Sequence, residues 1–267
     1  MIDLTPNHQP PLTIDRGEVI TLFHQLMRPH SLHRVLRLSG DPKMGKSHFL
    51  TKIFPHLARQ HYGARCITLD IRNLTSSQDF LHRLAMPLED FPHYHQTYQA
   101  WVNRSKVEVK NVFTLLTSIS LRNQAGPDEA QAHLRNLLTH LERDLRTLTS
   151  TPLLVMIDAL DDEYDKDPHL KSWVLNQFLP PLTQLNHLRL VLAGRQMPPA
   201  TSDYSGLCLD CHLTSVQDTA AYHTYCQHQP ITIDRHLIDG YILGAGYRPG
   251  FFIELLYNYI KFGGNRD

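Results

Sequence analysis

An eight-residue segment, Gly40 to Ser47, constrains the fold of this chain more than any other feature of the sequence. Its letters, GDPKMGKS, satisfy the pattern G-x-x-x-x-G-K-[ST] in full. A short apolar stretch, Arg34 to Leu38, precedes it and ends at a Ser39-Gly40 turn, and Ser47 to His61 follows with apolar residues at helical spacing. A loop between a strand and a helix is the context that separates a phosphate-binding loop from a chance match. The segment therefore predicts a P-loop on an α/β fold.

The residue types of this loop suit the binding of a nucleoside triphosphate with Mg²⁺. Gly40 and Gly45 let the loop turn so that its N–H groups and the start of the helix face phosphate oxygens. Lys46 would reach the β- and γ-phosphates, and the Ser47 hydroxyl would bind the metal. The nucleotide-binding residues expected in this region are Gly40, Asp41, Pro42, Lys43, Met44, Gly45, Lys46, Ser47 and His48.

A second anchor for the magnesium is expected at an acidic residue that ends a neighbouring buried strand. Leu153 to Ile157 are five consecutive apolar residues, as in a parallel strand buried on both faces, and Asp158 follows them. Asp158 would hold Mg²⁺ through water. Asp161 and Asp162 are close enough along the chain to align or deprotonate the attacking water; the alternative is that they cap the next helix or face solvent.

An arginine also follows an apolar strand. Leu188 to Ala193 (LRLVLA) is such a strand, and Gly194-Arg195 comes directly after it. Ligands of open α/β sheets bind at the carboxyl ends of the strands, so Arg195 would lie on the rim that carries the P-loop. It could contact the γ-phosphate and report its loss; the alternative is a surface arginine in a loop.

Strands that alternate with helices predict an α/β fold, a P-loop NTPase three-layer sandwich with a mostly parallel central sheet. Two more strands are expected at 65–70 and 207–213, helices near 78–85 and from Pro127, and a helical insertion at 87–124. Beyond Thr214 the pattern becomes helical, at 215–227, 233–243 and 249–262. We therefore expect a P-loop domain over 1–213 and a small helical lid subdomain over 214–267.

Composition restricts the partners and the location. Lys plus Arg equals Asp plus Glu at 26 each, so the whole-chain charge does not indicate nucleic acid or an anionic membrane. Met1 to Pro11 lacks the apolar core of a secretory signal, and no stretch approaches the roughly 18 apolar residues that cross a bilayer. Four cysteines do not suggest a disulfide framework. These features predict a cytoplasmic protein without a membrane partner.

One motif competes with this interpretation. Cys208 to His212 matches C-x-x-C-H, the attachment motif of c-type haem, but it falls on an expected strand in a chain without an export signal. Zinc held by Cys208, Cys211, His223 and Cys226 is conceivable. Buried free cysteines are the commoner alternative, and we favour them.

Taken in order, these segments resemble the STAND class of P-loop NTPases, which includes the NACHT and NB-ARC groups. Ile14 to Glu18, with Leu22-Phe23, is similar to the N-terminal adenine-side segment of that class, which we place at 12–27. Asp158-Ala159-Leu160-Asp161-Asp162 is similar to the D-G-h-D-E motif, with Ala159 and Asp162 replacing its Gly and Glu. Ala193-Gly194-Arg195 is similar to a sensor arginine motif without its hydroxyl residues. Gly246 to Pro249 resembles the G-x-P turn with one extra residue.

The resemblance covers roughly residues 12–262 and implies an ATP/ADP switch that hydrolyses slowly and oligomerises when loaded with ATP. It adds Arg16 and Pro249 to the expected nucleotide-binding residues, and it favours adenine. Such switches act in signalling or anti-phage defence, here as a homo-oligomer or with separately encoded effector or sensor proteins. Arg104, Arg122 or Arg248 could act on a neighbour's nucleotide. The alternatives are an AAA+-type ATPase that remodels or loads a protein or DNA partner, and a nucleotide-binding scaffold without turnover.

Overall fold

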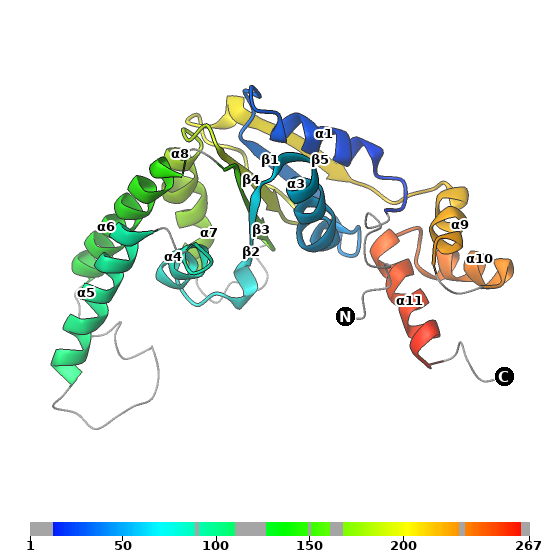
Figure 1. Ribbon diagram of the computed structural model, residues 1–267. Helices are drawn as coiled ribbons and strands as arrows, with labels where there is room; N and C mark the ends of the chain where they lie inside the picture. The colour runs from blue at the N-terminus through cyan, green and yellow to red at the C-terminus, as the bar shows by residue number, and fades with distance from the viewer. Residues whose placement is uncertain are drawn as a thin grey trace.

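The computed structural model describes residues 13–88, 91–109, 127–148, 151–160, 168–229 and 233–262. Its centre is a five-stranded sheet in the order β2-β3-β4-β1-β5, in which every pair of neighbours is parallel (Figure 1). The strands are β1 (Val35–Gly40), β2 (Arg65–Asp70), β3 (Leu153–Asp158), β4 (Leu188–Ala193) and β5 (Cys208–Leu213). The predicted parallel α/β sheet is therefore confirmed.

The apolar content of each strand matches its place in the sheet. All six residues of β3 and all six of β4 are buried, as their continuous apolar runs predict. The two edge strands, β2 and β5, each contain exposed residues. Within β4 one charged side chain is buried: Arg189 donates from Nε to the carbonyl of Leu26 at 2.7 Å and from a terminal nitrogen to that of Arg28 at 3.1 Å. Arg189 thus satisfies carbonyls at the end of the first helix.

Helices cover both faces of the sheet and complete three layers (Figure 1). One face packs against α1 (Gly17–Met27) and a continuous helix made of α2 (Lys46–His48), the π-helical segment η1 (Phe49–Ile53) and α3 (Phe54–Tyr62). The other face packs against α4 (Ser77–Ala85), α5 (Pro92–Val109), α6 (Pro127–Thr147), α7 (Pro168–Trp173), the π-helical segment η5 (Val174–Phe178) and α8 (Leu179–Leu182). Short 3₁₀ turns at Ile71–Asn73 and Ser205–Leu207 join the elements.

Both π-helical segments lie directly before prolines. Pro55 lies in the first turn of α3, and Pro180-Pro181 lie in α8. A proline inside a helix has no N–H to donate and its ring crowds the carbonyl four residues earlier, and the wider π turn relieves that crowding. The sequence predicts one helix at 47–61, which is confirmed, but not its widened turn.

The long hairpin of α5 and α6 projects from one side of the sheet (Figure 1). Asp144 on α6, only 1% exposed, accepts the N–H of Tyr94 at 2.7 Å and lies 2.5 Å from Nδ1 of His93. One carboxylate therefore satisfies the first turn of α5 and holds the two helices together. The expected helical insertion at 87–124 is helical in α5, and residues 110–126 lie outside the described ranges.

The C-terminal portion is helical, as predicted, with α9 (Thr219–Gln227), α10 (Arg235–Gly244) and α11 (Pro249–Phe262). These helices share their own apolar cluster, which includes Tyr222, Ile242 and Phe252. Ile14, which precedes α1, is buried in the same cluster. The N-terminal segment thus packs with the last helices of the chain. The boundary between 213 and 214 remains a prediction.

One strand end differs from the sequence-based expectation. A turn was expected at Ser39-Gly40, but both residues continue β1 and pair with His212 and Leu213 of β5. The partner strand extends far enough to hold them in the ladder, and local turn propensity does not reveal this. In the part of the chain that the structure describes, no helix is long and apolar enough to cross a membrane.

Candidate nucleotide-binding site

The P-loop begins at Gly40, the last residue of β1, and ends where α2 starts at Lys46. Three of its residues have positive φ angles: 142° at Gly40, 68° at Lys43 and 98° at Gly45. The backbone reverses at these points, which glycine allows at two of them without strain. Phe49 then donates its N–H to the carbonyl of Gly45 at 3.1 Å, so the helix starts directly from the loop.

The two glycines are required for different reasons. A Cβ on Gly40 would lie 2.5 Å from the carbonyl oxygen of Leu213, so β5 approaches too closely for any side chain. A Cβ on Gly45 would meet no atom within 4 Å, so only its backbone conformation calls for glycine. The motif predicts that the loop needs both glycines for its turns. The close packing of Gly40 against β5 is seen only in the structure.

Lys46 lies over the loop. Its ammonium donates to the carbonyl oxygens of Gly40 and Asp41, the latter at 2.9 Å. This places the charge in the turn where the phosphates are expected. Ser47 follows in α2 and is exposed, and its carbonyl accepts the hydroxyl of Thr51 at 2.7 Å. Among the remaining loop residues Asp41, Pro42 and Lys43 are exposed, Met44 is buried in the core beside the sheet, and His48 ends α2 half-buried.

Asp158 ends β3 at the same edge of the sheet. It is 6% exposed and its Oδ1 accepts the N–H of Ala159 at 2.8 Å. Ala159 has a φ of 62°, so the chain turns sharply after the carboxylate. The sequence suggested that the strand carrying Asp158 neighbours β1. In the structure β4 lies between the two strands. Serine hydroxyl and carboxylate oxygens are the donors that Mg²⁺ prefers, so Ser47 and Asp158 fit this ion chemically.

Arg195 follows that intervening strand. Its carbonyl accepts the N–H of Gly40 at 3.1 Å, and the N–H of Gly194 donates to the carbonyl of Leu38 at 3.1 Å. The backbone of Arg195 therefore touches the first residue of the P-loop. Its side chain is half-buried. The backbone of Arg195 therefore lies at the carboxyl ends of the strands, which is where the sequence placed this residue.

Some predicted residues cannot be placed. Asp161, Asp162 and Arg122 lie outside the described residues, so their roles remain predictions. Arg104 is part of α5 and Arg248 directly precedes α11.

Arg16 joins the P-loop to the C-terminal portion. Its guanidinium donates to the carbonyl of Thr214 at 2.6 Å and to that of Met44 at 3.3 Å. Burial lowers the pKa of this guanidinium, and Tyr222 and Asp15 oppose the shift by favouring its charged form. The resemblance places Arg16 at the adenine; in the structure it contacts the loop and the segment that leads to α9.

The first turn of α11 lies directly on the P-loop. Pro249 is buried at its start, and the N–H of Gly250 donates to the carbonyl of Lys43 at 2.8 Å. The Lys43 ammonium lies 2.6 Å from the Glu254 carboxylate, one turn further along α11. The sequence did not predict that Gly250 and Glu254 contact the P-loop. A glycine directly after the proline that begins a helix was the one local hint of a close backbone approach.

The cysteines do not form a shared site. Cys208 and Cys211 are three residues apart on a strand, so their side chains point to opposite faces of the sheet, and they pack against different cores. Cys226 belongs to the C-terminal cluster, and His223 pairs with Asp239 at 2.7 Å. No cluster of three or more metal-ligating side chains occurs among the described residues. The four cysteines form no disulfide, and Cys211 and Cys226 are buried whereas Cys66 and Cys208 are partly buried.

No protein-family model matches the sequence, and no curated protein does. Among solved structures, the Walker-type ATPase PABY2304 of Pyrococcus abyssi is similar, with a TM-score of 0.53 at 15% identity over 98% of this chain and 71% of that one. A DNA replication initiation factor has a TM-score of 0.48 at 13% identity, over 95% of this chain and 64% of that one. Cdc6p from Pyrobaculum aerophilum has a TM-score of 0.44 at 14% identity, over 84% and 52%. The first similarity shows that the fold is that of a Walker-type P-loop ATPase.

Proposed function

We propose that this chain binds Mg-ATP on the loop from Gly40 to Ser47 and hydrolyses it slowly as a molecular switch. One observation carries the proposal. Because β4 lies between β1 and β3, the P-loop, Arg195 and Asp158 all follow adjacent strands at one edge of the sheet. This is the arrangement in which a lysine, an arginine and a carboxylate can act on one triphosphate.

Each side chain has a distinct part in this proposal. Lys46, which now bonds to carbonyls of its own loop, would exchange them for β- and γ-phosphate oxygens. Ser47 and Asp158 would hold Mg²⁺, which supplies charge compensation for the transferred phosphoryl group. Asp161 and Asp162 would orient or deprotonate the attacking water, and Arg195 would contact the γ-phosphate.

Support for a switch comes from contacts between the P-loop and the C-terminal helices. The carbonyl of Lys43 accepts the N–H of Gly250 in α11. Arg16 links the loop to the segment before α9, because its guanidinium donates to the carbonyls of both Met44 and Thr214. A change of loop conformation on loss of the γ-phosphate would break or re-form these bonds. Movement of α9 to α11 against the sheet would then report the nucleotide state.

The STAND-like subtype, with adenine specificity, rests on the order of the motifs and on the place of Arg16 and Pro249 beside the loop. It implies that the ATP-loaded form oligomerises or engages separately encoded effector or sensor proteins in signalling or anti-phage defence. The division into a P-loop domain and a helical lid, and a cytoplasmic location, belong to the same proposal.

Calorimetry and phosphate release test the proposal. Purified protein is titrated with ATP, ADP and GTP with and without Mg²⁺, and phosphate release is followed for the wild type and Lys46→Ala. We expect ATP binding that is lost in Lys46→Ala, slow release, and a larger particle by light scattering with Mg-ATP. A wild-type chain that binds none of these nucleotides would overturn it.

An AAA+-type ATPase and a nucleotide-binding scaffold could have the same fold, and the same experiment distinguishes these alternatives from a switch. An AAA+-type remodeller or loader would hydrolyse ATP faster when single-stranded or duplex DNA, or a protein client, is added. A scaffold without turnover would bind ATP in the titration, but its phosphate release would equal that of Lys46→Ala.

A further inference from the structure

Strand β5 forms one open edge of the sheet, beside β1. A Cβ on Gly40 would lie 2.5 Å from the carbonyl oxygen of Leu213, so that carbonyl faces β1. Backbone groups of successive strand residues point to alternate sides, so those of Asp210 and His212 point away from β1. Within the described ranges no other strand pairs with this outer side. The edge of β5 therefore presents backbone donors and acceptors at strand spacing.

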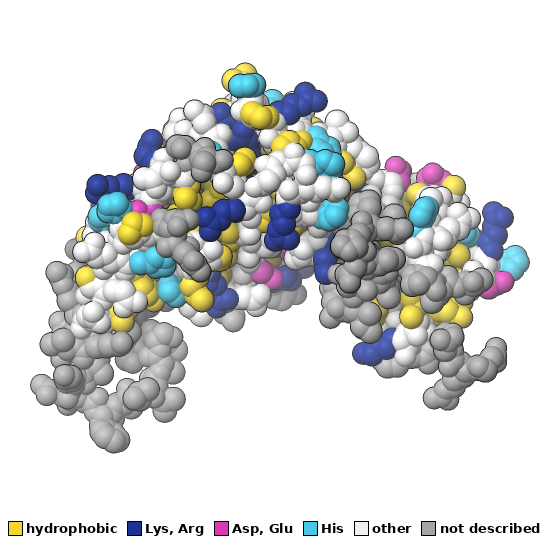
Figure 2. All heavy atoms as spheres, viewed as in Figure 1, with side chains coloured by type: hydrophobic (Ala, Val, Ile, Leu, Met, Phe, Trp, Pro, Cys, Tyr) yellow, Lys and Arg dark blue, Asp and Glu magenta, His cyan; other side chains and the backbone are white. Residues whose placement is uncertain are grey.

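Helix α1 covers one face of β5 and leaves its edge open. Phe23 of α1 shares an apolar cluster with Cys211 and Leu213 of β5. Further along the helix, the carbonyl of Leu26 accepts a hydrogen bond from Arg189 of β4, so α1 runs across the sheet away from the edge. In Figure 1 α1 lies along the top of the molecule, and Figure 2 shows the hairpin of α5 and α6 and the C-terminal helices extending below it. The described helices therefore leave the outer side of β5 open to a second molecule.

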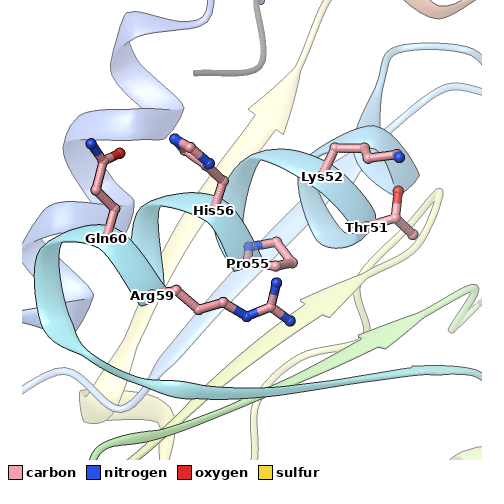
Figure 3. A pocket seen from close by; sticks show the side chains of 6 residues that line it. All are labelled: Thr51, Lys52, Pro55, His56, Arg59 and Gln60. Atoms are coloured by element: carbon pink, nitrogen blue, oxygen red, sulfur yellow. The ribbon is translucent and has the colours of Figure 1, made fainter. Parts of the chain in front are cut away.

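The outer face of η1 and α3 differs from this edge. It carries a hollow of about 500 Å³, which is lined among the described residues by Thr51, Lys52, Pro55, His56, Arg59 and Gln60 (Figure 3). These side chains all come from one continuous helix, and polar side chains on the outer face of a helix normally contact water. Helical N–H and C=O groups bond within the helix. An interface held by main-chain bonds therefore requires a strand edge.

The polar side chains along the edge of β5 are balanced in charge. On the face opposite α1, Asp210 pairs with Arg37 of β1 at 2.7 Å, yet its side chain is 66% exposed. His212 is also exposed, and its Nδ1 lies 2.9 Å from the hydroxyl of Ser39. The contact with Arg37 uses Oδ1 of Asp210, which leaves Oδ2 of Asp210 and Nε2 of His212 for a further partner. An edge of this kind does not repel a copy of itself.

Charges on the α1 side are balanced as well. Burial raises the pKa of the Cys211 thiol, Glu18 adds to the shift, and Arg16 opposes it. One acidic and one basic side chain therefore lie near Cys211, at the start of α1. Residues 1–12, outside the described ranges, contain Asp3 but neither lysine nor arginine. Two copies that meet at β5 would thus bring no excess of like charge together on this side.

Symmetry restricts how two copies can pair through β5. A two-fold axis perpendicular to the sheet makes the two strands antiparallel and keeps each face continuous. Outward residues then face outward residues as hydrogen-bonded pairs. A pairing centred on Asp210 sets two carboxylates opposite each other, which is unfavourable. A pairing centred on Cys211 instead sets Asp210 opposite the partner's His212, and symmetry repeats this favourable pair.

The α1 side also matches in the register centred on Cys211. The axis sets Cys211 opposite the partner's Cys211 and Leu209 opposite the partner's Leu213. Residues that face each other without exchanging hydrogen bonds have side chains in close contact. Leu209 is half-buried in the single chain, so the pairing would cover its apolar surface with another leucine.

We propose that β5 is a homodimer interface in which two copies pair antiparallel about Cys211, with Asp210 of one protomer on His212 of its partner. The two five-stranded sheets would then form one continuous sheet. This interface does not involve the P-loop, so the inference does not rest on the proposed function and holds without nucleotide. A peptide of another protein would meet the same edge, but only a second copy supplies the complementary pair twice.

Sedimentation equilibrium of the full chain without nucleotide tests the dimer. We expect a species of twice 30.8 kDa whose fraction rises with protein concentration. His212→Asp sets carboxylates opposite each other at both symmetric pairs, yet it keeps an acceptor for the Ser39 hydroxyl. This variant should weaken dimerisation roughly tenfold or more. His236→Asp makes the same change at an exposed position of α10 and should dimerise like the wild type.

A mixture of two variants tests the register. Asp210→Lys should also weaken the homodimer, because the introduced lysine faces the partner's His212. When this variant is mixed with His212→Asp, a heterodimer should form, because the introduced lysine faces the introduced carboxylate. The second pair keeps the native Asp210 and His212. Recovery of the dimer would also show that both variants are folded.

Hydrogen exchange resolved to single amides locates the interface. The amides of Asp210 and His212 should exchange more slowly as protein concentration rises, since dimerisation gives them partners. The amide of Cys211 already faces β1 and should not respond to concentration.

Four results would overturn the proposal. One is a chain that stays monomeric at every concentration or dimerises only with Mg-ATP. Another is equal dimerisation of the wild type and His212→Asp. The third is slow exchange at Asp210 and His212 that does not depend on concentration, because a segment of the same chain would then cover the edge. The last is a dimer without slower exchange at these two amides. A chain that dimerises in this way but binds no nucleotide would contradict the proposed function alone.

Discussion

The backbone N–H of Gly250 donates to the carbonyl oxygen of Lys43 at 2.8 Å, and a Cβ on Gly250 would lie 2.6 Å from that same oxygen. Glycine is thus the residue that lets the first turn of α11 rest on the P-loop. Because both contacting groups are backbone, neither can rotate away from an added methyl group. The position of the last helix is set by the conformation of the loop that we propose binds phosphate.

Replacing Gly250 with alanine should therefore separate α11 from the P-loop. The added methyl forces backbone to move and weakens a hydrogen bond, so we expect a loss of about 1–3 kcal/mol in the free energy of unfolding. Urea denaturation followed by circular dichroism measures it. ATP affinity in calorimetry should change in the same variant, because the carbonyl of Lys43 is displaced.

Gly240→Ala is the matched control. Gly240 lies inside α10, where a Cβ would meet no atom within 4 Å. Alanine should therefore stabilise that helix by about 0.5–1 kcal/mol through its higher helix propensity. If the two variants have the same stability, the close contact between Gly250 and Lys43 is not a constraint in solution.

The fold was accessible from the sequence because its strongest determinants are local. Continuous apolar runs mark β3 and β4, and the G-x-x-x-x-G-K-S loop sets the turn from β1 into α2. Contacts between distant segments were not accessible. The sequence around Asp144 does not indicate that its side chain caps α5. The sequence around Leu213 does not indicate that this residue pairs with Gly40 and lengthens β1.

In the candidate site, too, the sequence predicts the residues that belong to a local motif but not the contacts between distant segments. Lys46, Ser47 and Asp158 follow from motif and strand end, since each lies where its own segment places it. The bonds from Arg16 to Thr214 and from Gly250 to Lys43 join segments that are far apart in sequence, and a single sequence carries no pattern that pairs them. Strand order likewise decides that β4, not β3, is the direct neighbour of β1.

Gly40→Ala should be far more destabilising than Gly63→Ala, a change at another glycine with positive φ that is not crowded. At Gly40 the φ is 142° and the new Cβ would lie 2.5 Å from the Leu213 carbonyl oxygen. At Gly63, which ends α3 with a φ of 59°, a Cβ would meet nothing within 4 Å. We expect Gly63→Ala to cost about 1 kcal/mol and Gly40→Ala at least about 2 kcal/mol more. Equal losses in thermal denaturation would contradict both the close approach of β5 to Gly40 and the greater backbone strain of a φ of 142°.

Asp158→Asn should reduce magnesium binding without unfolding the chain. The asparagine oxygen can still accept the N–H of Ala159, so the turn after β3 is kept while the charge is removed. A residue that holds the metal through water typically contributes 10–100-fold to metal affinity or activity, so we expect a loss of about that size in Mg²⁺-dependent phosphate release. Nucleotide binding measured in EDTA should not change.

Asp70→Asn provides the comparison for Asp158. Asp70 is the register partner of Asp158 at the end of β2, one strand further from the P-loop, and it pairs with Arg72. Removing this partly exposed carboxylate should leave the magnesium dependence as in the wild type. Equal effects of the two substitutions would contradict a specific role for Asp158.

The partly buried thiol of Cys208 and the buried thiol of Cys226 should react slowly with alkylating reagents in the folded chain. Burial raises the pKa of Cys208 to about 11 and that of Cys226 to about 11, above the ordinary value for a thiol. The thiolate is the reactive form, and at pH 8 a group with a pKa of about 11 is deprotonated in only about one molecule in a thousand. The pKa is raised, so reactivity should increase about tenfold for each pH unit from 8 to 10. Mass spectrometry after timed iodoacetamide treatment measures this, with urea-unfolded protein as the control in which all four cysteines react quickly. Rapid labelling of Cys208 at pH 8 in the folded chain would contradict its raised pKa. A disulfide between Cys208 and Cys211 would contradict their placement on opposite faces of β5.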